Sequence, residues 1–136
     1  MSIDWRRASA DELRTHLGDM DLAAFEAACD NPELNDELVR LLLKNPGLPS
    51  DLVERISREP RFFQKNVVRV ALALHPKLPR VRGLELVRWL YWRDLLRVAT
   101  RPSVHPQVRV MSDQLLAEKI PDLTVGERIA LARAAS

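Results

Sequence analysis

The sequence predicts an all-α protein, an α-α superhelix of about nine short helices that forms a single domain over residues 1–136. Two observations predict this fold. Prolines 32, 46 and 60 are spaced 14 residues apart and mark out two matched units over residues 31–60. Within each unit, apolar residues at offsets of 4, 5 and 8 from the first leucine share one helical face. Because so short a unit cannot bury its apolar stripe alone, the units must stack on their neighbours.

The two units agree position by position. The matching pairs are Leu34 and Leu48, Leu38 and Leu52, Val39 and Val53, and Leu42 and Ile56. A longer period of 30 residues relates Asn45-Pro46 to His75-Pro76. The proline turn itself, with an apolar residue two places later, recurs at Pro32, Pro46, Pro60, Pro76, Pro102 and Pro121. Such a proline ends the preceding helix and fixes φ, and the apolar residue anchors the turn in the core.

The element boundaries follow from capping residues and breakers. Residues 1–30 are expected to form N-terminal capping helices, and residues 61–136 to form less regular, basic repeats. Side chains that can cap a helix are Ser9 with Glu12, Asp19 or Asp21, Asn35, Ser50, and Thr124 with Glu127. Outside the matched units, helices are expected from Ser9 to about Leu17 and over 22–29, 67–74, 83–90, 94–100, 106 to about 118, and 128–135.

The segment 67–74 is apolar on nearly every side, and β-branched residues crowd its start. Taken alone it could be a buried strand. We interpret it as a helix, since it lies between two proline turns and has no second strand to pair with. A helix that is apolar all round is expected to be central.

Composition argues against several classes of function. The single cysteine, Cys29, excludes an internal disulfide framework, favours a reducing, cytoplasmic setting, and is interpreted as a small buried apolar residue. No segment approaches the ~20 apolar residues of a membrane span, so no membrane partner is expected. His16, His75 and His105 are too scattered for a metal site, and the two that precede proline predict turn hydrogen bonds. No nucleotide-binding or nucleophile motif is present, so no catalytic, cofactor-binding or metal-binding residue is assigned.

Charge divides the chain into two halves. Residues 1–60 carry 7 Lys+Arg against 13 Asp+Glu, a net of −6, and residues 61–136 carry 14 against 6, a net of +8. The basic half could face an anionic partner or the acidic half of another copy. An arginine-rich solvated surface is the simplest interpretation.

The run NPELNDELVRLLLKNPGLPSDLVERISREP and the later HPKLP resemble HEAT-like and leucine-rich-variant α-solenoid repeats. The segments DLLRVATRPSVHPQVR and EKIPDLTVGERIALAR look like those of uncharacterised bacterial members of this group. The resemblance covers roughly residues 20–136 and implies a non-enzymatic scaffold that binds proteins on a concave surface. A smaller branch of the group, the HEAT-like DNA glycosylases, implies nucleic-acid binding. The motifs are structural, so they specify the fold better than the function.

Basic and aromatic residues gather between residues 80 and 101. The candidate partner-binding residues are Arg80, Arg82, Arg88, Tyr91, Trp92, Arg93, Arg97 and Arg101. They suit a nucleic-acid platform, a protein hot spot, or simply a core with a solvated rim. Trp89 lies three residues after Leu86 and is expected to point inward, whereas Tyr91 and Trp92 are expected at the surface.

The last helix reads RIALARAA, with two arginines as its only polar residues. One face is expected to dock at Leu115 and Leu116, and the smooth remainder to contact another copy or a further repeat. The sequence therefore predicts a protein or peptide partner, and at the C-terminal helix either the contact of a homo-oligomer or the junction to further repeats of a longer array. Nucleic acid is the alternative partner.

Overall fold

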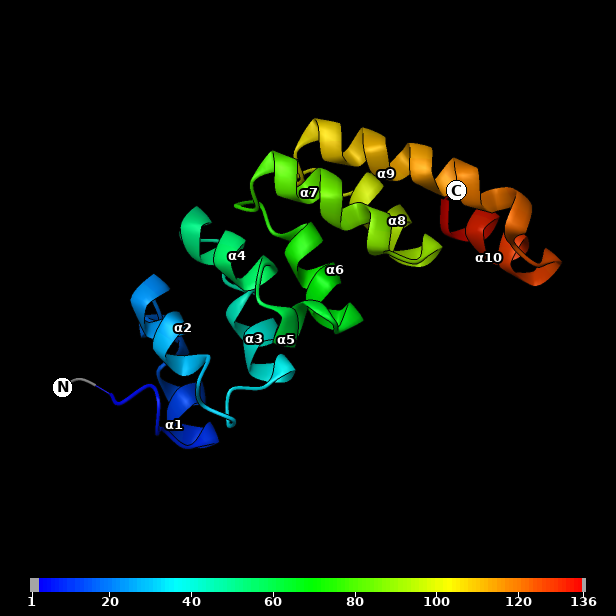
Figure 1. The fold of residues 1–136 in the computed structure, drawn as a ribbon. Coiled ribbons are helices and arrows are strands. Elements are labelled where there is room, and N and C mark those ends of the chain that lie inside the picture. The colour runs from blue at the N-terminus through cyan, green and yellow to red at the C-terminus, as the bar shows by residue number, and fades with distance from the viewer. Residues whose placement is uncertain (1–2, 136) are drawn as a thin grey trace.

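The computed structural model describes residues 3–135, and every regular element in that range is helical. The chain advances from α1 at one end to α9 and α10 at the other, and α10 turns back beside α9 (Figure 1). The α-helices are α1 (Ala10–Thr15), α2 (Leu22–Ala28), α3 (Asp36–Leu42), α4 (Ser50–Ser57), α5 (Pro60–Phe63), α6 (Asn66–Leu74), α7 (Arg80–Leu86), α8 (Trp92–Ala99), α9 (Pro106–Lys119) and α10 (Val125–Ala135). Three 3₁₀ turns, η1 (Leu17–Asp19), η2 (Val87–Trp89) and η3 (Ile120–Asp122), complete the described elements.

Helices that are distant in sequence pack on one another in two rows. In one row α3 contacts α6, and α6 contacts α8. In the other, α2 contacts α4, and α7 contacts α9. Because α6 also contacts α4 and α7, it joins the two rows and holds the centre of the molecule.

The predicted apolar stripe is confirmed. All eight matched residues of the two units are buried, none more than 4% exposed. α3 begins after Asn35, whose side chain accepts the amide hydrogen of Leu38 at 2.9 Å, as expected of an N-cap. The repeat therefore predicts both where these helices begin and which face they bury.

Several boundaries differ from the expectation. The first helix ends at Thr15, two residues early, and a 3₁₀ turn follows it. Ser50 is not an N-cap: it is the first residue of α4, after Pro49, and its hydroxyl donates instead to the carbonyl of Lys77 at 2.8 Å. The helix expected over 83–90 begins earlier, at Arg80, and becomes a 3₁₀ turn after Leu86.

Other expectations hold. Residues 66–74 form the helix α6 rather than a strand. The two capping boxes are formed, since the amides of Glu12 and Glu127 bond the hydroxyls of Ser9 and Thr124 at 3.2 and 3.1 Å. The short α5 was not predicted, because its four residues lie where the 14-residue period breaks down.

Each of four proline turns is closed by the side chain that precedes the proline. That side chain accepts a hydrogen bond from the amide two residues later, which satisfies a backbone donor in the turn. The bonds run from Glu33 N to Asn31 Oδ1 (3.0 Å), Gly47 N to Asn45 Oδ1 (3.0 Å), Lys77 N to His75 Nδ1 (3.0 Å) and Gln107 N to His105 Nδ1 (3.1 Å). The predicted turn role of the two histidines is confirmed, and Asn and His serve the same purpose here.

The buried His75 is fixed in one neutral tautomer. The amide of Lys77 can only donate, so Nδ1 must accept, and Nε2 carries the hydrogen that faces the carbonyl of Asn45 at 2.8 Å. Protonating Nδ1 would place its new hydrogen against the amide hydrogen of Lys77, so this hydrogen bond would be lost. Burial, only partly opposed by the Asn45 hydrogen bond, lowers the pKa of His75 below its usual 6.5.

We expect His75→Asn to remove part of the acid sensitivity of folding. Because the folded-state pKa lies below the unfolded value of 6.5, His75 contributes its full stability above that pH. The contribution is lost as pH falls from 6.5 toward the folded pKa, by up to about 1.4 kcal/mol per pH unit. Asn keeps the acceptor, as at Asn45. Urea unfolding at about pH 8 and about pH 5 should show a smaller difference in the variant than in the parent. The same pH dependence in both proteins would contradict this role.

Gly83 marks the closest approach of α7 to α9. A Cβ atom at this position would lie 2.9 Å from Cγ2 of Val108. We expect Gly83→Ala to lower the free energy of unfolding by about 1–3 kcal/mol, since the branched valine cannot swing away cheaply. Gly126→Ala is the matched control, because nothing lies within 4 Å of its Cβ position, and it should leave stability equal or higher. Equal shifts of the melting temperature in the two variants would contradict the close approach of α7 to α9.

Candidate functional site

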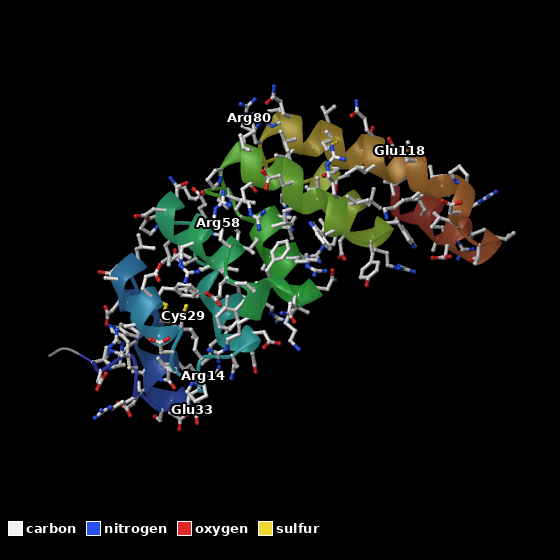
Figure 2. All side chains as sticks on the ribbon, in the orientation of Figure 1. Arg14, Cys29, Glu33, Arg58, Arg80 and Glu118 are labelled. Carbon is white, nitrogen blue, oxygen red and sulfur yellow. The ribbon has the colours of Figure 1, made fainter. Side chains whose placement is uncertain are left out.

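The structure divides the eight predicted partner-binding residues among several surfaces. Arg97 and Arg101 line one wall of a groove. Arg80 instead lies where α7 begins beside α9, and its guanidinium donates to the side chain of Gln107 (Figure 2). Tyr91 is exposed, as predicted. The sequence cluster therefore does not form one site.

The two tryptophans exchange their expected places. Trp89, expected to be core, is 58% exposed, and Trp92, expected at the surface, is 8% exposed. The α-helical spacing that placed Trp89 beside Leu86 stops where α7 becomes a 3₁₀ turn, and Val87 and Leu90 take the inward positions. The indole of Trp92 donates to the carboxylate of Glu127 at 3.0 Å, so it anchors α10 on α8.

Arg69 lies over the exposed Trp89, and both Arg69 and Arg82 lie over the neighbouring ring of Phe63. The guanidinium of Arg69 lies 5.1 Å from the ring of Phe63 and 5.3 Å from that of Trp89. Arg82 lies 4.9 Å from the Phe63 ring and also donates to the carbonyl of Ser57 at 2.6 Å. Arg82 therefore links α7 to α4. This residue, which was predicted to bind a partner, has a structural role in the fold.

A groove of about 660 Å³ runs along α6 between α3 and α8. Val67, Val70, Ala71 and Leu74 of α6 form its floor. These residues occupy positions i, i+3, i+4 and i+7, which is the stripe that one helix presents to another. α6 is central, as expected, since it contacts helices on several sides, but it is not buried all round: Val67 is 48% exposed in the groove.

The walls of the groove are basic. Arg40 and Lys44 line the side of α3, and Arg97 and Arg101 line the side of α8. All four are exposed, and Arg40, Lys44 and Arg101 have no side-chain partner among residues 3–135. Arg97 makes one loose ion pair, with Asp94 at 3.8 Å. Sequence reasoning missed Arg40 and Lys44, since both lie in the acidic half of the chain.

One end of the groove is closed by polar side chains of α6 and α8. The amide nitrogen of Asn66 donates to Asp94 at 3.2 Å, while its Oδ1 is buried without a partner. His75 lies at the other end. The groove thus has an apolar floor, two basic walls and one carboxylate near its end.

The remaining candidate for chemistry is Cys29. Burial raises the pKa of its thiol to about 11, although Arg55 nearby opposes the shift. At neutral pH the sulfur is therefore a thiol and a poor nucleophile, which fits its interpretation as an apolar residue. Among residues 3–135, no three His, Cys, Asp or Glu side chains are grouped in a way that could hold a metal ion.

Comparison of the chain with protein-family models, curated proteins and solved structures finds no match. The resemblance to HEAT-like repeats therefore stays a prediction. Within the described part of the chain, no helix combines the length and apolar character that crossing a membrane requires.

Proposed function

We propose that this protein is a non-enzymatic interaction module of the α-solenoid type, which presents the groove along α6 to a partner protein. The two rows of helices support the solenoid interpretation, because each helix pair packs mainly on its neighbours. The single cysteine supports placing the module in the cytoplasm.

The groove is the observation that carries this proposal. An apolar helix stripe at the bottom of a hollow, bordered by charged side chains, has the anatomy of a protein interface with an apolar centre and a polar rim. Three cations on its walls are free to pair with a partner.

Capture from a native lysate tests the proposal. The parent protein, Val67→Glu and Val81→Glu serve as baits, and mass spectrometry identifies what each retains. Val67 lies in the groove and Val81 is exposed on α7 outside it, so both variants add one charge at an exposed position. We expect at least one protein to be retained by the parent and by Val81→Glu but not by Val67→Glu. The same proteins on all three baits, or none, would contradict a groove function.

Nucleic acid remains the second candidate partner, because Trp89 and Tyr91 are 58% and 65% exposed in the basic half, and Arg88, which directly precedes Trp89, is also exposed. Exposed aromatic rings can stack on bases while arginines contact phosphates. If this is the function, binding to single-stranded or duplex probes should fall steeply between about 50 and 200 mM salt. The absence of binding even at low salt would eliminate it.

The C-terminal helix supports self-association. Leu131 is buried in the core cluster together with Leu116, and Leu115 packs against that cluster, whereas Val125 is 74% and Ile129 49% exposed on α10. We expect light scattering to show a mass that rises with concentration, and Ile129→Glu to suppress the rise. A strict monomer at high micromolar concentration would contradict this contact.

A further inference from the structure

We propose that the groove binds a short acidic amphipathic helix of a partner protein, with its apolar stripe on α6 and its carboxylates against both walls. This inference rests on the proposed function and specifies the chemistry of the partner. It follows from three properties of the described residues: the spacing of the floor, the cations of the walls and the net charge.

The floor is spaced to receive a helix. Positions i, i+3, i+4 and i+7 of α6 form a straight apolar stripe, and each helix of a packed pair presents such a stripe to the other. The opposite face of α6, with Val68 and Leu72, is already buried in the core. The face toward the groove is only partly covered, since Val67 is 48% exposed, Val70 is 7% exposed, and Ala71 and Leu74 are partly buried.

The walls carry cations on both edges of that helix. Arg40 lies in α3 and Arg97 in α8, while Lys44 and Arg101 follow just beyond the ends of those helices. Each wall thus offers two cations to acidic residues on one flank of an incoming helix. An occupant with a central apolar stripe and acidic residues on both sides matches the whole groove.

The net positive charge of the groove favours a partner that carries negative charge. Four cations line it against one carboxylate, Asp94, which leaves three positive charges. Three of the cations lack a partner within residues 3–135, so an acidic helix would not have to displace an existing pair to reach them. The field would also speed the encounter with an acidic partner.

The lining argues against nucleic acid as the occupant. Among the described residues, no Phe, Tyr or Trp side chain lines the groove, and the exposed Trp89 and Tyr91 do not belong to it. Bases would thus find valine, alanine and leucine instead of rings to stack on. Those same residues suit the apolar stripe of a helix.

A peptide-display selection tests this inference. Random peptides long enough for about four helical turns are selected on the full-length parent protein. Binders that are also retained by Val67→Glu are then removed, which leaves those that depend on the groove. Thermal melts establish that Val67→Glu is folded. We expect the groove-dependent peptides to combine an apolar stripe with Asp or Glu on both flanks.

The arginines are then tested with the best selected peptide, carrying a fluorophore for anisotropy. We expect Arg40→Gln/Arg101→Gln to weaken binding about 2- to 20-fold, since it removes one unpaired cation from each wall. The matched control is Arg14→Gln/Arg88→Gln, which removes the same charge at exposed positions outside the groove and should bind as the parent does. A peptide with Gln in place of its acidic residues should also bind more weakly.

The outcomes separate this inference from the proposed function. Groove-dependent peptides that are neutral or basic, or an equal effect of the two double variants, would overturn the acidic helix but leave the groove as a protein site. A complete lack of groove-dependent peptides, together with no groove-dependent protein from the lysate, would overturn both. Nucleic-acid binding or self-association that is lost in Val67→Glu would assign the groove to that occupant and overturn the inference.

Discussion

Leu52→Ala is expected to lower the free energy of unfolding by about 2–5 kcal/mol. Leu52 of α4 is fully buried in the second matched unit, and its equivalent Leu38 of α3 is 1% exposed. Truncating either side chain removes buried methyl groups and leaves a cavity that its helical neighbours can only partly fill. Chemical denaturation of both variants should show losses of similar size, because the repeat gives the two residues equivalent places.

Arg40→Ala provides the control on the same helix as Leu38. Arg40 is exposed on the groove wall and has no side-chain partner within residues 3–135. Its removal should change stability by no more than about 0.5 kcal/mol. If Arg40→Ala lowered the free energy of unfolding as much as Leu38→Ala, the predicted apolar stripe would not face the core, and the interpretation of the repeat would be wrong.

The parts of the fold that the sequence predicts correctly are those set by local spacing. Leu38 and Leu52 are buried as the repeat requires, and Asn35 caps its helix. The turn role of His75 also follows from its place before a proline. In each case the pattern that makes the prediction lies within one helical turn or one tight turn.

Errors arise where tertiary packing changes the local geometry. Trp89 would face inward if α7 continued, but the chain tightens into a 3₁₀ turn after Leu86, and the aromatic ring turns outward. Trp92 is buried in the core, and its indole donates to Glu127, which lies 35 residues later. No periodicity within a single helix could reveal either change.

The candidate groove was missed for a related reason. Its walls come from α3 and α8, which lie on opposite sides of α6 and in the acidic and basic halves of the chain. A count of charge by sequence segment separates Arg40 from Arg97, although the fold brings them to one hollow. The exposure of Val67 was missed too, because a helix that is apolar on nearly every side looks wholly buried even where one of its residues reaches solvent.

Arg61 is a structural residue that no sequence pattern marks. Its guanidinium lies 4.9 Å from the ring of Phe62 and holds together the turn between α2 and α3. Its two terminal nitrogens donate to the carbonyl oxygens of Cys29, Asn31, Pro32 and Leu34. Planar geometry with several fixed donors lets one arginine satisfy carbonyls that point to a common centre.

We expect Arg61→Ala to cost about 2–4 kcal/mol, because partly buried carbonyls would lose a charged donor and the ring of Phe62 its cover. Arg61→Lys should recover only a minor part of the loss, since a lysine ammonium keeps the charge but lacks the fork. Arg58→Ala is the control: Arg58 is exposed and pairs with Glu54 at 3.1 Å within one helix, so its removal should cost no more than about 0.5 kcal/mol. Denaturant unfolding of the three variants distinguishes the contribution of the planar guanidinium geometry from that of the positive charge. If Arg61→Lys kept the full stability of the parent, charge alone would hold this turn. If Arg61→Ala lost no more stability than Arg58→Ala, water would replace the guanidinium without cost.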